Sequence, residues 1–209
     1  MEIISHRGYW KKPAEKNSAV AFKRSFKNAF GTETDVRDSL GQLVISHDMA
    51  LGNEISLTTF LSMTSPTFPL LALNIKADGL AKLFSQKMAF YPRDKWFVFD
   101  MSVPDMREHL SVGNPVFVRL SEVEKLPAFF DKSDGVWLDS FFSEWFELEL
   151  IISLLKDGKR VCIVSSELHG RDPHELWDKL LPLCDVDGLI LCTDYPVKVS
   201  ELFTKELKT

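Results

Sequence analysis

Short apolar runs alternate with longer amphipathic stretches along the whole chain of 209 residues. The apolar runs are rich in Val, Ile, Leu and Phe and are bounded by polar or turn-forming residues, which is typical of β-strands. The stretches between them repeat apolar residues at helical spacing. The predicted strands cover residues 2–5, 32–36, 70–75, 96–99, 115–118, 135–138, 160–164 and 188–191, and the predicted helices cover 18–29, 77–90, 104–109, 146–156, 174–181 and 197–206.

Strands that alternate with helices predict a parallel α/β sheet. Eight such strands in this sequence favour closure into a compact (β/α)₈ TIM barrel, which forms a single domain over residues 1–209. The alternative is an open, doubly wound sheet. No glycine-rich dinucleotide-binding fingerprint follows any predicted strand, which weakens that alternative.

Nearly all of the predicted strands run into a polar group at their carboxyl end, and most of these groups are ionisable. Barrel enzymes assemble their active sites from side chains at these strand ends. The simpler explanation is that every strand must leave the core through polar residues, but the number of ionisable groups favours a shared site. The residues are His6 with Arg7, Glu33 with Asp35, Asn74 with Lys76, and then Asp100, Arg119, Asp139, Glu167 and Asp194.

One of these strand ends carries two candidate metal ligands. Glu33 and Asp35 are two residues apart on one predicted strand, so their side chains share a face. Two carboxylates that point into one barrel repel each other unless a cation lies between them. A hard divalent cation, Mg²⁺ or Ca²⁺, suits such oxygen ligands. The alternative is that Arg7 or Lys76 neutralises them without a metal.

Two histidines follow short apolar strands and are candidates for acid–base chemistry. His6 ends the first predicted strand, and His47 ends a short extended segment at 43–46 that returns from a turn. An imidazole titrates near neutrality, so two of them on opposite sides of a phosphodiester can act as base and acid. His109, His169 and His174 are interpreted as structural, with His169 the first candidate for an exception.

Composition narrows the classes of function. The chain is 45% hydrophobic and 26% charged, as soluble globular proteins are, and its net charge of −5 argues against a nucleic-acid binder. The three cysteines lie in apolar segments and are expected to be buried free thiols. No signal peptide or membrane-spanning run is recognisable, so we expect a cytoplasmic protein without an integral membrane segment. Its oligomeric state is not readable from the sequence.

The ordered motifs resemble those of the glycerophosphodiester phosphodiesterase family, whose (β/α)₈ barrel is shared with phosphatidylinositol-specific phospholipase C. The matching elements are S-H-R-G at 5–8, E-T-D at 33–35, S-H-D at 46–48, N-I-K at 74–76 and T-D-Y-P at 193–196. The first three fall within the first 48 residues, in the order and at the spacing of the family. The match beyond Lys76 is weaker.

The resemblance implies roles for individual residues. His6 and His47 correspond to the acid–base pair of the family, and Glu33 and Asp35 correspond to metal ligands. Arg7 and Lys76 are similar to residues that contact the phosphate, where they would neutralise developing charge together with the metal. The implied substrate is a small-molecule phosphodiester.

Two departures from the family pattern affect the expected substrate and metal. Asn74 stands where the family has a third, glutamate ligand, and an amide oxygen can still bind Mg²⁺ or Ca²⁺ but brings no charge. The cap that the family inserts before its third barrel strand is largely absent, since residues 49–69 leave room for one short helix. We therefore expect a more open mouth and a substrate other than a simple glycerophosphodiester. Tyr9, Trp10 and Trp137 are candidates to bind its alcohol group, with core packing as the alternative for Trp137.

Three functions remain open at this point. The first is a metal-dependent phosphodiester hydrolase that uses His6 and His47. The second is a catalytically weak barrel that binds a phosphorylated ligand. The third is a lyase that releases a cyclic phosphate, as phospholipase C relatives do. The presence of both histidines and both carboxylates favours the first.

Overall fold

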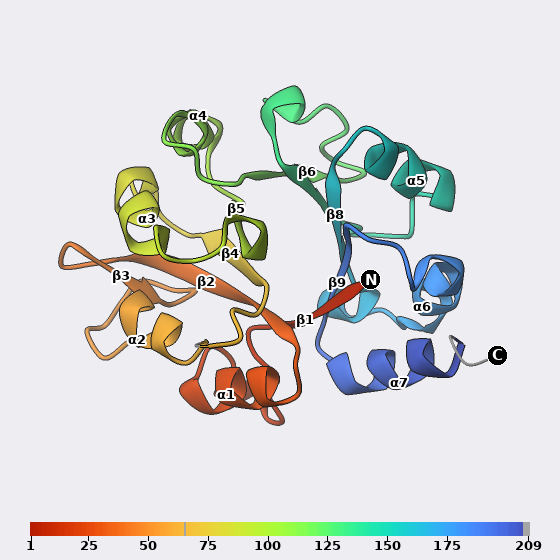
Figure 1. The fold of residues 1–209 in the computed structure, drawn as a ribbon, viewed down its shortest axis with the longest axis horizontal. Coiled ribbons are helices and arrows are strands. Elements are labelled where there is room, and N and C mark those ends of the chain that lie inside the picture. Colours follow the sequence, from red (N-terminus) through yellow and green to blue (C-terminus); the bar gives the residue numbers. More distant parts are fainter. Residues whose placement is uncertain (65, 207–209) are drawn as a thin grey trace.

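The computed structural model describes residues 1–64 and 66–206. Within them, parallel strands form a nearly closed barrel with helices on its outer side, which confirms the predicted fold class (Figure 1). Neighbouring strands follow the order β5-β4-β2-β1-β9-β8-β7-β6. These strands are β1 (Glu2–His6), β2 (Gly31–Ser39), β4 (Leu71–Ile75), β5 (Trp96–Phe99), β6 (Phe117–Leu120), β7 (Gly135–Leu138), β8 (Arg160–Val164) and β9 (Leu189–Thr193).

The helices lie where the sequence pattern predicts them, with bounds that differ by a few residues. In the described part of segment 49–69, which leaves out residue 65, a single short helix forms, α2, as expected for a chain that lacks a large insertion there. The helices are α1 (Ala19–Lys27), α2 (Leu57–Ser62), α3 (Ala81–Met88), α4 (Val103–Ser111), α5 (Leu148–Lys156), α6 (His174–Leu180) and α7 (Pro196–Glu206). None of the described helices is long and apolar enough to span a membrane.

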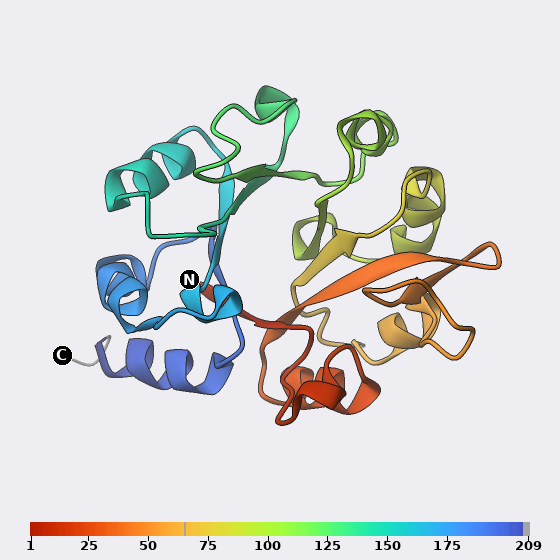
Figure 2. The ribbon, with the colours of Figure 1, turned by 180° about the vertical axis from the view of Figure 1, so that it is seen from behind.

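Strand β2 extends beyond the barrel wall into a hairpin. Its last residues pair in antiparallel register with β3 (Gln42–Ile45), after a turn at Leu40 and Gly41. Figure 2 looks onto the carboxyl ends of the strands and shows this hairpin beside α2 and α3. The hairpin carries the residues that follow β3, including His47, to the same end of the barrel.

The barrel closes least completely between β5 and β6. These two strands are joined by a single isolated bridge, from Val98 to Val116, whereas the other neighbouring strands pair over several consecutive residues. We call this junction the seam. It lies on the side of the barrel opposite β1 and β9, where the chain begins and where its last strand returns (Figure 1).

Each strand buries one set of alternating residues inside the barrel and the other set under the helices. On β4, Ala72 lies in the inner cluster, whereas Leu71 and Leu73 pack in the outer core. The inner cluster consists of Ile4, Leu70, Ala72, Phe97, Phe99, Phe117, Trp137, Cys162, Val164, Ile190 and Cys192. Cys162, Cys184 and Cys192 are all buried and free, as the sequence predicts.

The same alternation carries polar groups into the mouth of the barrel. On several strands, the residue two positions after an inner apolar residue is polar, so both point toward the barrel axis. These pairs are Ile4 with His6, Ala72 with Asn74, Phe117 with Arg119, Trp137 with Asp139, and Cys192 with Asp194. The site is therefore built directly on top of the inner core.

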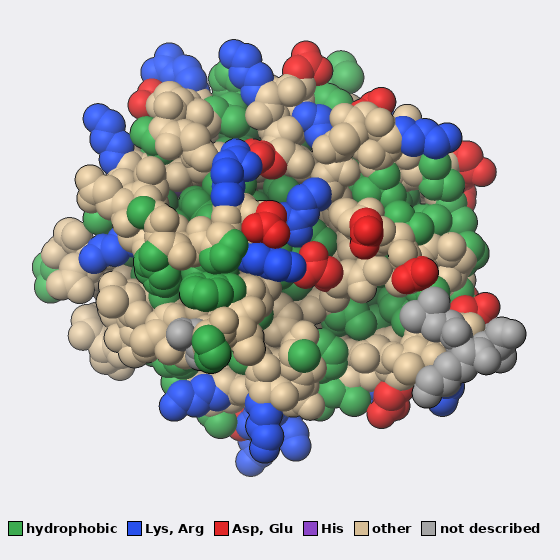
Figure 3. All heavy atoms as spheres, in the orientation of Figure 1, with side chains coloured by type: hydrophobic (Ala, Val, Ile, Leu, Met, Phe, Trp, Pro, Cys, Tyr) green, Lys and Arg blue, Asp and Glu red, His purple; other side chains and the backbone are tan. Residues whose placement is uncertain are grey.

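The opposite end of the barrel carries charges but no comparable arrangement of histidines. Figure 3 views that end and shows Lys, Arg, Asp and Glu side chains of both signs near its centre, with no histidine in view. Ion pairs link Arg93 to Asp134 at 2.6 Å and Glu2 to Lys95 at 3.4 Å. These pairs join elements at the amino ends of the strands.

Candidate active site

His6 is held at the mouth by the carboxylate that follows the last barrel strand. Its Nδ1 lies 2.8 Å from Oδ1 of Asp194, which also accepts a hydrogen bond from the indole N–H of Trp10 at 3.2 Å. Because an ionised carboxylate only accepts hydrogen bonds, Nδ1 of His6 carries the proton. Its Nε2 is then the atom that faces the site, 3.9 Å from Oε2 of Glu33.

Glu33 is the most buried carboxyl group next to His6, with 2% of its surface exposed. Burial raises the pKa of its carboxyl group well above the ordinary range, and the neighbouring Asp35 carboxylate raises this pKa further. The charges of Arg7 and Lys76 act in the opposite direction. The register supports this proximity, because His6 pairs directly with Glu33 across β1 and β2.

Asp35 is fully buried and lies among three donors. Nε of Arg7 lies 2.8 Å from its Oδ2, and Nζ of Lys76 lies 3.2 Å from its Oδ1. The amide of Asn17 also donates to Oδ2, at 2.8 Å. Two cations thus form ion pairs with this buried carboxylate and offset its charge.

Asn74 joins this cluster to the neighbouring strands. Its amide Nδ2 donates to Oδ2 of Asp100 at 3.0 Å, and its Oδ1 is buried without a hydrogen-bond partner among the described residues. Asp100 in turn forms an ion pair with Arg119 of β6. Asp35 and Asn74 pair directly across β2 and β4, so their side chains share the inner face.

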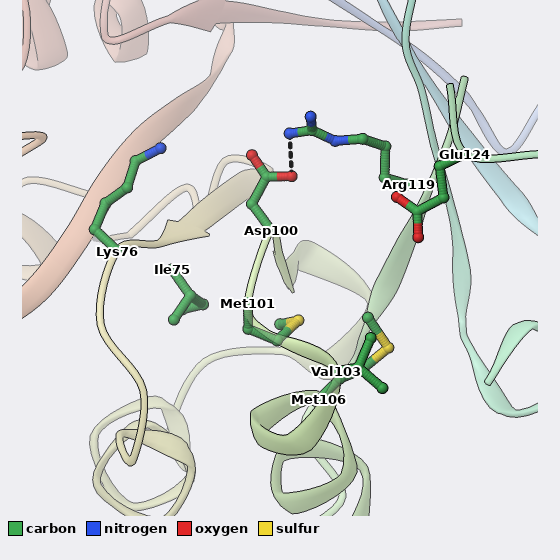
Figure 4. Close-up of a pocket in the computed structure, with 8 residues that line it drawn as sticks. All are labelled: Ile75, Lys76, Asp100, Met101, Val103, Met106, Arg119 and Glu124. Atoms are coloured by element: carbon green, nitrogen blue, oxygen red, sulfur yellow. Dashed lines mark hydrogen bonds and ion pairs between the residues drawn. The ribbon is translucent and has the colours of Figure 1, made fainter. Parts of the chain in front are cut away.

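A cavity of about 440 Å³ opens beside this cluster. Figure 4 shows Lys76 and Arg119 on its two sides, with Asp100 between them and the side chains of Met101 and Met106 below. Its wall combines charged groups with thioethers and aliphatic side chains. Such a cavity has room for one ester group of a small phosphodiester.

His47 lies at the rim of the site rather than in its centre. Its side chain is 50% exposed, and its Nδ1 lies 2.8 Å from Oδ1 of Asp48. The preceding residue, Ser46, donates its backbone N–H to the carbonyl of Asp35, which fixes the segment beside the cluster. The His47 contact lowers the pKa of the Asp48 carboxyl group, and the more distant charge of Arg7 lowers it further.

The predicted aromatic residues occupy two different environments. Trp137 is 5% exposed and stacks on Phe99 inside the barrel, with ring centroids 3.9 Å apart. It forms the floor beneath Asp139 rather than an open stacking surface. Tyr9 and Trp10 line a second cavity of about 330 Å³, which also borders Asp194.

A second histidine–carboxylate pair lies at the carboxyl ends of β7 and β8. Nε2 of His169 is 2.7 Å from Oδ1 of Asp139, and the ring of Phe141 packs edge-on against the imidazole. The guanidinium of Arg119 lies over Phe141, 5.2 Å from the ring centre. His169 is thus partnered at the strand ends, as its position after β8 suggested.

Three side chains of the cluster have the oxygen atoms that a hard divalent cation would require. Glu33 and Asp35 have carboxylates, and Asn74 has a buried carbonyl oxygen, Oδ1, without a hydrogen-bond partner among the described residues. Within the described residues, no group of three His, Cys, Asp or Glu side chains lies close enough to hold a metal. A metal at this position would therefore depend on the Asn74 carbonyl.

No protein-family model and no curated protein sequence matches this chain. Solved structures do match its fold. The glycerophosphodiester phosphodiesterase of Parabacteroides distasonis has a TM-score of 0.70 at 17% identity, over 99% of this chain and 98% of that one. The enzyme of the same description from Agrobacterium tumefaciens has a TM-score of 0.68 at 16% identity, over 100% of both chains.

A third match carries a ligand in its description. An Oleispira antarctica phosphodiesterase in complex with the product sn-glycerol-3-phosphate has a TM-score of 0.65 at 14% identity, over 100% of this chain and 97% of that one. This chain therefore has the barrel fold of the glycerophosphodiester phosphodiesterases, over its full described length. The fold that the motifs predicted by resemblance is confirmed.

Several residues of the site had no assigned role in the sequence. Asp100 and Arg119 were recognisable only as polar strand ends, and Asp194 only as a strand end within the T-D-Y-P motif; their partners became visible only in the structure. The side chain of Asn17 bridges Asp35 and Thr34. Ser18 is the residue that caps α1.

Proposed function

We propose that this chain is a metal-dependent phosphodiester hydrolase. The observation that carries the proposal is the His6–Asp194 pair, whose free imidazole nitrogen faces a buried carboxyl group next to the cations Arg7 and Lys76. An oriented imidazole provides an acid–base group, and the two cations can stabilise negative charge on phosphoryl oxygens. The likeness to solved phosphodiesterases supports the reaction class.

Each residue has a defined part in this proposal. His6, oriented through Nδ1 by Asp194, exchanges a proton through Nε2. His47, next to Asp35 along the hairpin, serves as the second proton carrier. Arg7 and Lys76 leave Asp35 to bind the phosphate. Glu33, Asp35 and Asn74 would hold Mg²⁺ or Ca²⁺, and such a cation would supply further neutralisation of charge on the phosphate.

The alcohol groups of the substrate are assigned to the two cavities at the mouth. One group occupies the cavity beside Lys76 and Arg119, and the other occupies the cavity lined by Tyr9 and Trp10. The short segment between β3 and β4 leaves this end with little cover. We propose a substrate with an alcohol bulkier than glycerol and assign Trp137 the role of supporting Asp139 from below.

A panel of phosphodiesters, including bis(p-nitrophenyl) phosphate, assayed with Mg²⁺, Ca²⁺ or chelator tests the reaction and the metal together. Replacing His6 by Ala should lower kcat about 10²–10⁴-fold, because an oriented general acid or base contributes about this factor. His47→Ala should also lower it. His174→Ala is the matched control, since that histidine is 73% exposed and its ion pair is with its sequence neighbour Asp172.

The same assay contains the results that would contradict the proposal. Full turnover in the His6→Ala variant would remove the assigned acid–base role. Binding of phosphate esters without turnover, at any metal concentration, would instead support a binding protein. The ion pairs of Asp35 with both Arg7 and Lys76 are the observation that favours this second function. Phosphorus NMR of the products would reveal a persistent cyclic phosphate if the chain is a lyase.

A further inference from the structure

The side chain of Asn74 has two different ends, and they meet different surroundings. Nδ2 donates to Asp100 at 3.0 Å. Oδ1 is buried and has no hydrogen-bond partner among the described residues, and only 8% of the surface of Asn74 is exposed. A buried carbonyl oxygen without a donor is unfavourable unless something else occupies its lone pairs.

The identity of the neighbour fixes which end points where. An ionised carboxylate only accepts hydrogen bonds, so Asp100 must face the NH₂ group of Asn74 and not its carbonyl. Strand β4 lies between β2 and β5, and Asp100 follows β5. The carbonyl oxygen is therefore directed away from β5, toward the β2 side, where Asp35 is the direct register partner of Asn74.

The backbone places Asp100 where it can do this. Phe97 and Phe99 point into the barrel, so a continued strand would turn the next side chain outward. Asp100 instead has a φ of 67°, in the left-handed region that non-glycine residues rarely adopt. Strained conformations of this kind persist where the surroundings hold them, and they gather at functional sites.

Arg119 completes the arrangement from the other side of the seam. Its guanidinium pairs with Oδ1 of Asp100 and leaves Oδ2 for Asn74 (Figure 4). A carboxylate paired with a guanidinium only accepts hydrogen bonds, so Asp100 accepts from Asn74 and does not donate to it. One carboxylate oxygen of Asp100 thus pairs with the Arg119 guanidinium, and the other accepts a hydrogen bond from the Asn74 amide.

We infer that Asp100 and Arg119 form a positioning pair that fixes the amide of Asn74 with its carbonyl oxygen toward a divalent cation held with Glu33 and Asp35. This inference rests on the metal site of the proposed function. A glutamate at position 74, as in the family that the motifs resemble, would need no such pair because both of its terminal atoms are oxygens. The pair lets the amide of Asn74 serve as a metal ligand where the family has a carboxylate. In other metal sites, too, residues that hydrogen-bond to the ligands fix the orientation of those ligands.

The test is a double-mutant cycle on cation affinity, measured by titration calorimetry with Mg²⁺ and Ca²⁺ and no substrate. Asp100→Asn should weaken binding about tenfold or more, because the new amide lets Asn74 turn its NH₂ group toward the cation. In the Asn74→Asp background, orientation no longer matters. There, Asp100→Asn should change the affinity no more than the control Asp78→Asn, which removes an exposed charge from the same end of the barrel.

Equal losses in the two backgrounds would overturn the inference, since they would show that Asp100 acts only through its charge. Absence of cation binding in the unaltered protein would overturn the metal site itself, which separates the two failures. If Asp100→Asn does not fold, Arg119→Gln gives a second test. Loss of a nearby positive charge should tighten cation binding, whereas release of Asp100 from its position should weaken it, and only weakening supports the positioning pair.

Discussion

At the scale of single residues, His109 shows how hydrogen-bond partners decide a charge state. Its imidazole is fully buried on α4, and its Nδ1 lies 3.0 Å from the amide nitrogen of Asn114. That nitrogen is a donor, so Nδ1 accepts and the proton resides on Nε2, 3.4 Å from Asp105. Burial lowers the pKa of His109 from its ordinary value of 6.5, although the charges of Asp105 and Asp78 oppose this change.

This environment predicts a dependence of stability on pH. Between the lowered pKa of folded His109 and 6.5, the unfolded chain binds a proton that the folded chain does not. The free energy of unfolding should therefore fall as the pH drops through this window, by at most about 1.4 kcal/mol per pH unit from this group. His109→Gln can accept the same hydrogen bond from Asn114 without titrating, and urea unfolding of the two proteins at several pH values isolates the difference. A difference that stays constant with pH would contradict the assignment.

The sequence predicted some residues of the site and not others for a physical reason. His6, Glu33 and Asp35 follow from strand alternation, because a strand's parity fixes which side chains face the axis. The environment of His47 does not follow, since it depends on how the hairpin beyond β2 folds back. Strand alternation also predicts that the side chain of Trp137 points into the barrel. Only the structure shows that this side chain stacks on Phe99 and is therefore part of the core.

At the scale of elements, the start of α1 connects the first strand to the site. Ser18 accepts a hydrogen bond from the backbone N–H of Ala21, as an N-cap does. Gly8 lies against the same helix with a φ of 82°, and a Cβ at this position would lie 2.7 Å from Cβ of Ala21. The loop that carries Arg7 is thus fixed by a cap and by a close backbone approach.

Ser18→Ala should lower the free energy of unfolding by about 1 kcal/mol, because it leaves an N–H of the first turn without its partner. Ser18→Gly is the matched variant and should lower the free energy of unfolding by only about a few tenths of a kcal/mol, since glycine is tolerated as a cap. Denaturant titrations of the three proteins provide the measurement. Similar losses for both variants would show that the side chain of Ser18 acts by packing and not as a cap.

Element positions were predictable because apolar periodicity changes clearly between strands and helices. The helices at 146–156 and 174–181 begin or end within two residues of α5 and α6. Helix ends were less predictable because capping residues decide them: Ser18 caps α1, whereas the neighbouring Asn17 does not, although both residue types are common caps. Asn17 has a φ of 58°, which takes it out of the helix and directs its amide to Asp35.

At the scale of the whole molecule, the number of strands predicted the barrel, but nothing in the sequence indicated where its closure is weakest. Closure depends on how far neighbouring strands overlap, which is a property of the complete ring. At the seam, a bridge from Val98 to Val116 stands in place of a ladder. Ion pairs support it at both ends: Asp100 with Arg119 at the mouth, and Arg93 with Asp134 at the opposite end.

The seam gives this barrel a preferred route for transient opening. Amide protons of β5 and β6 that lack a cross-strand partner should exchange with solvent deuterium sooner than those of β1 and β9, which pair over several residues. Arg93→Gln should speed deuterium exchange in peptides of β5 and β6 and not in peptides of the other strands, as measured by mass spectrometry. Equal exchange rates in all barrel strands would contradict a weak junction between β5 and β6. Asp100 follows β5 and Arg119 lies on β6, so each opening of the seam would separate them. The lifetime of the closed barrel would then limit how long a cation stays bound at the proposed metal site.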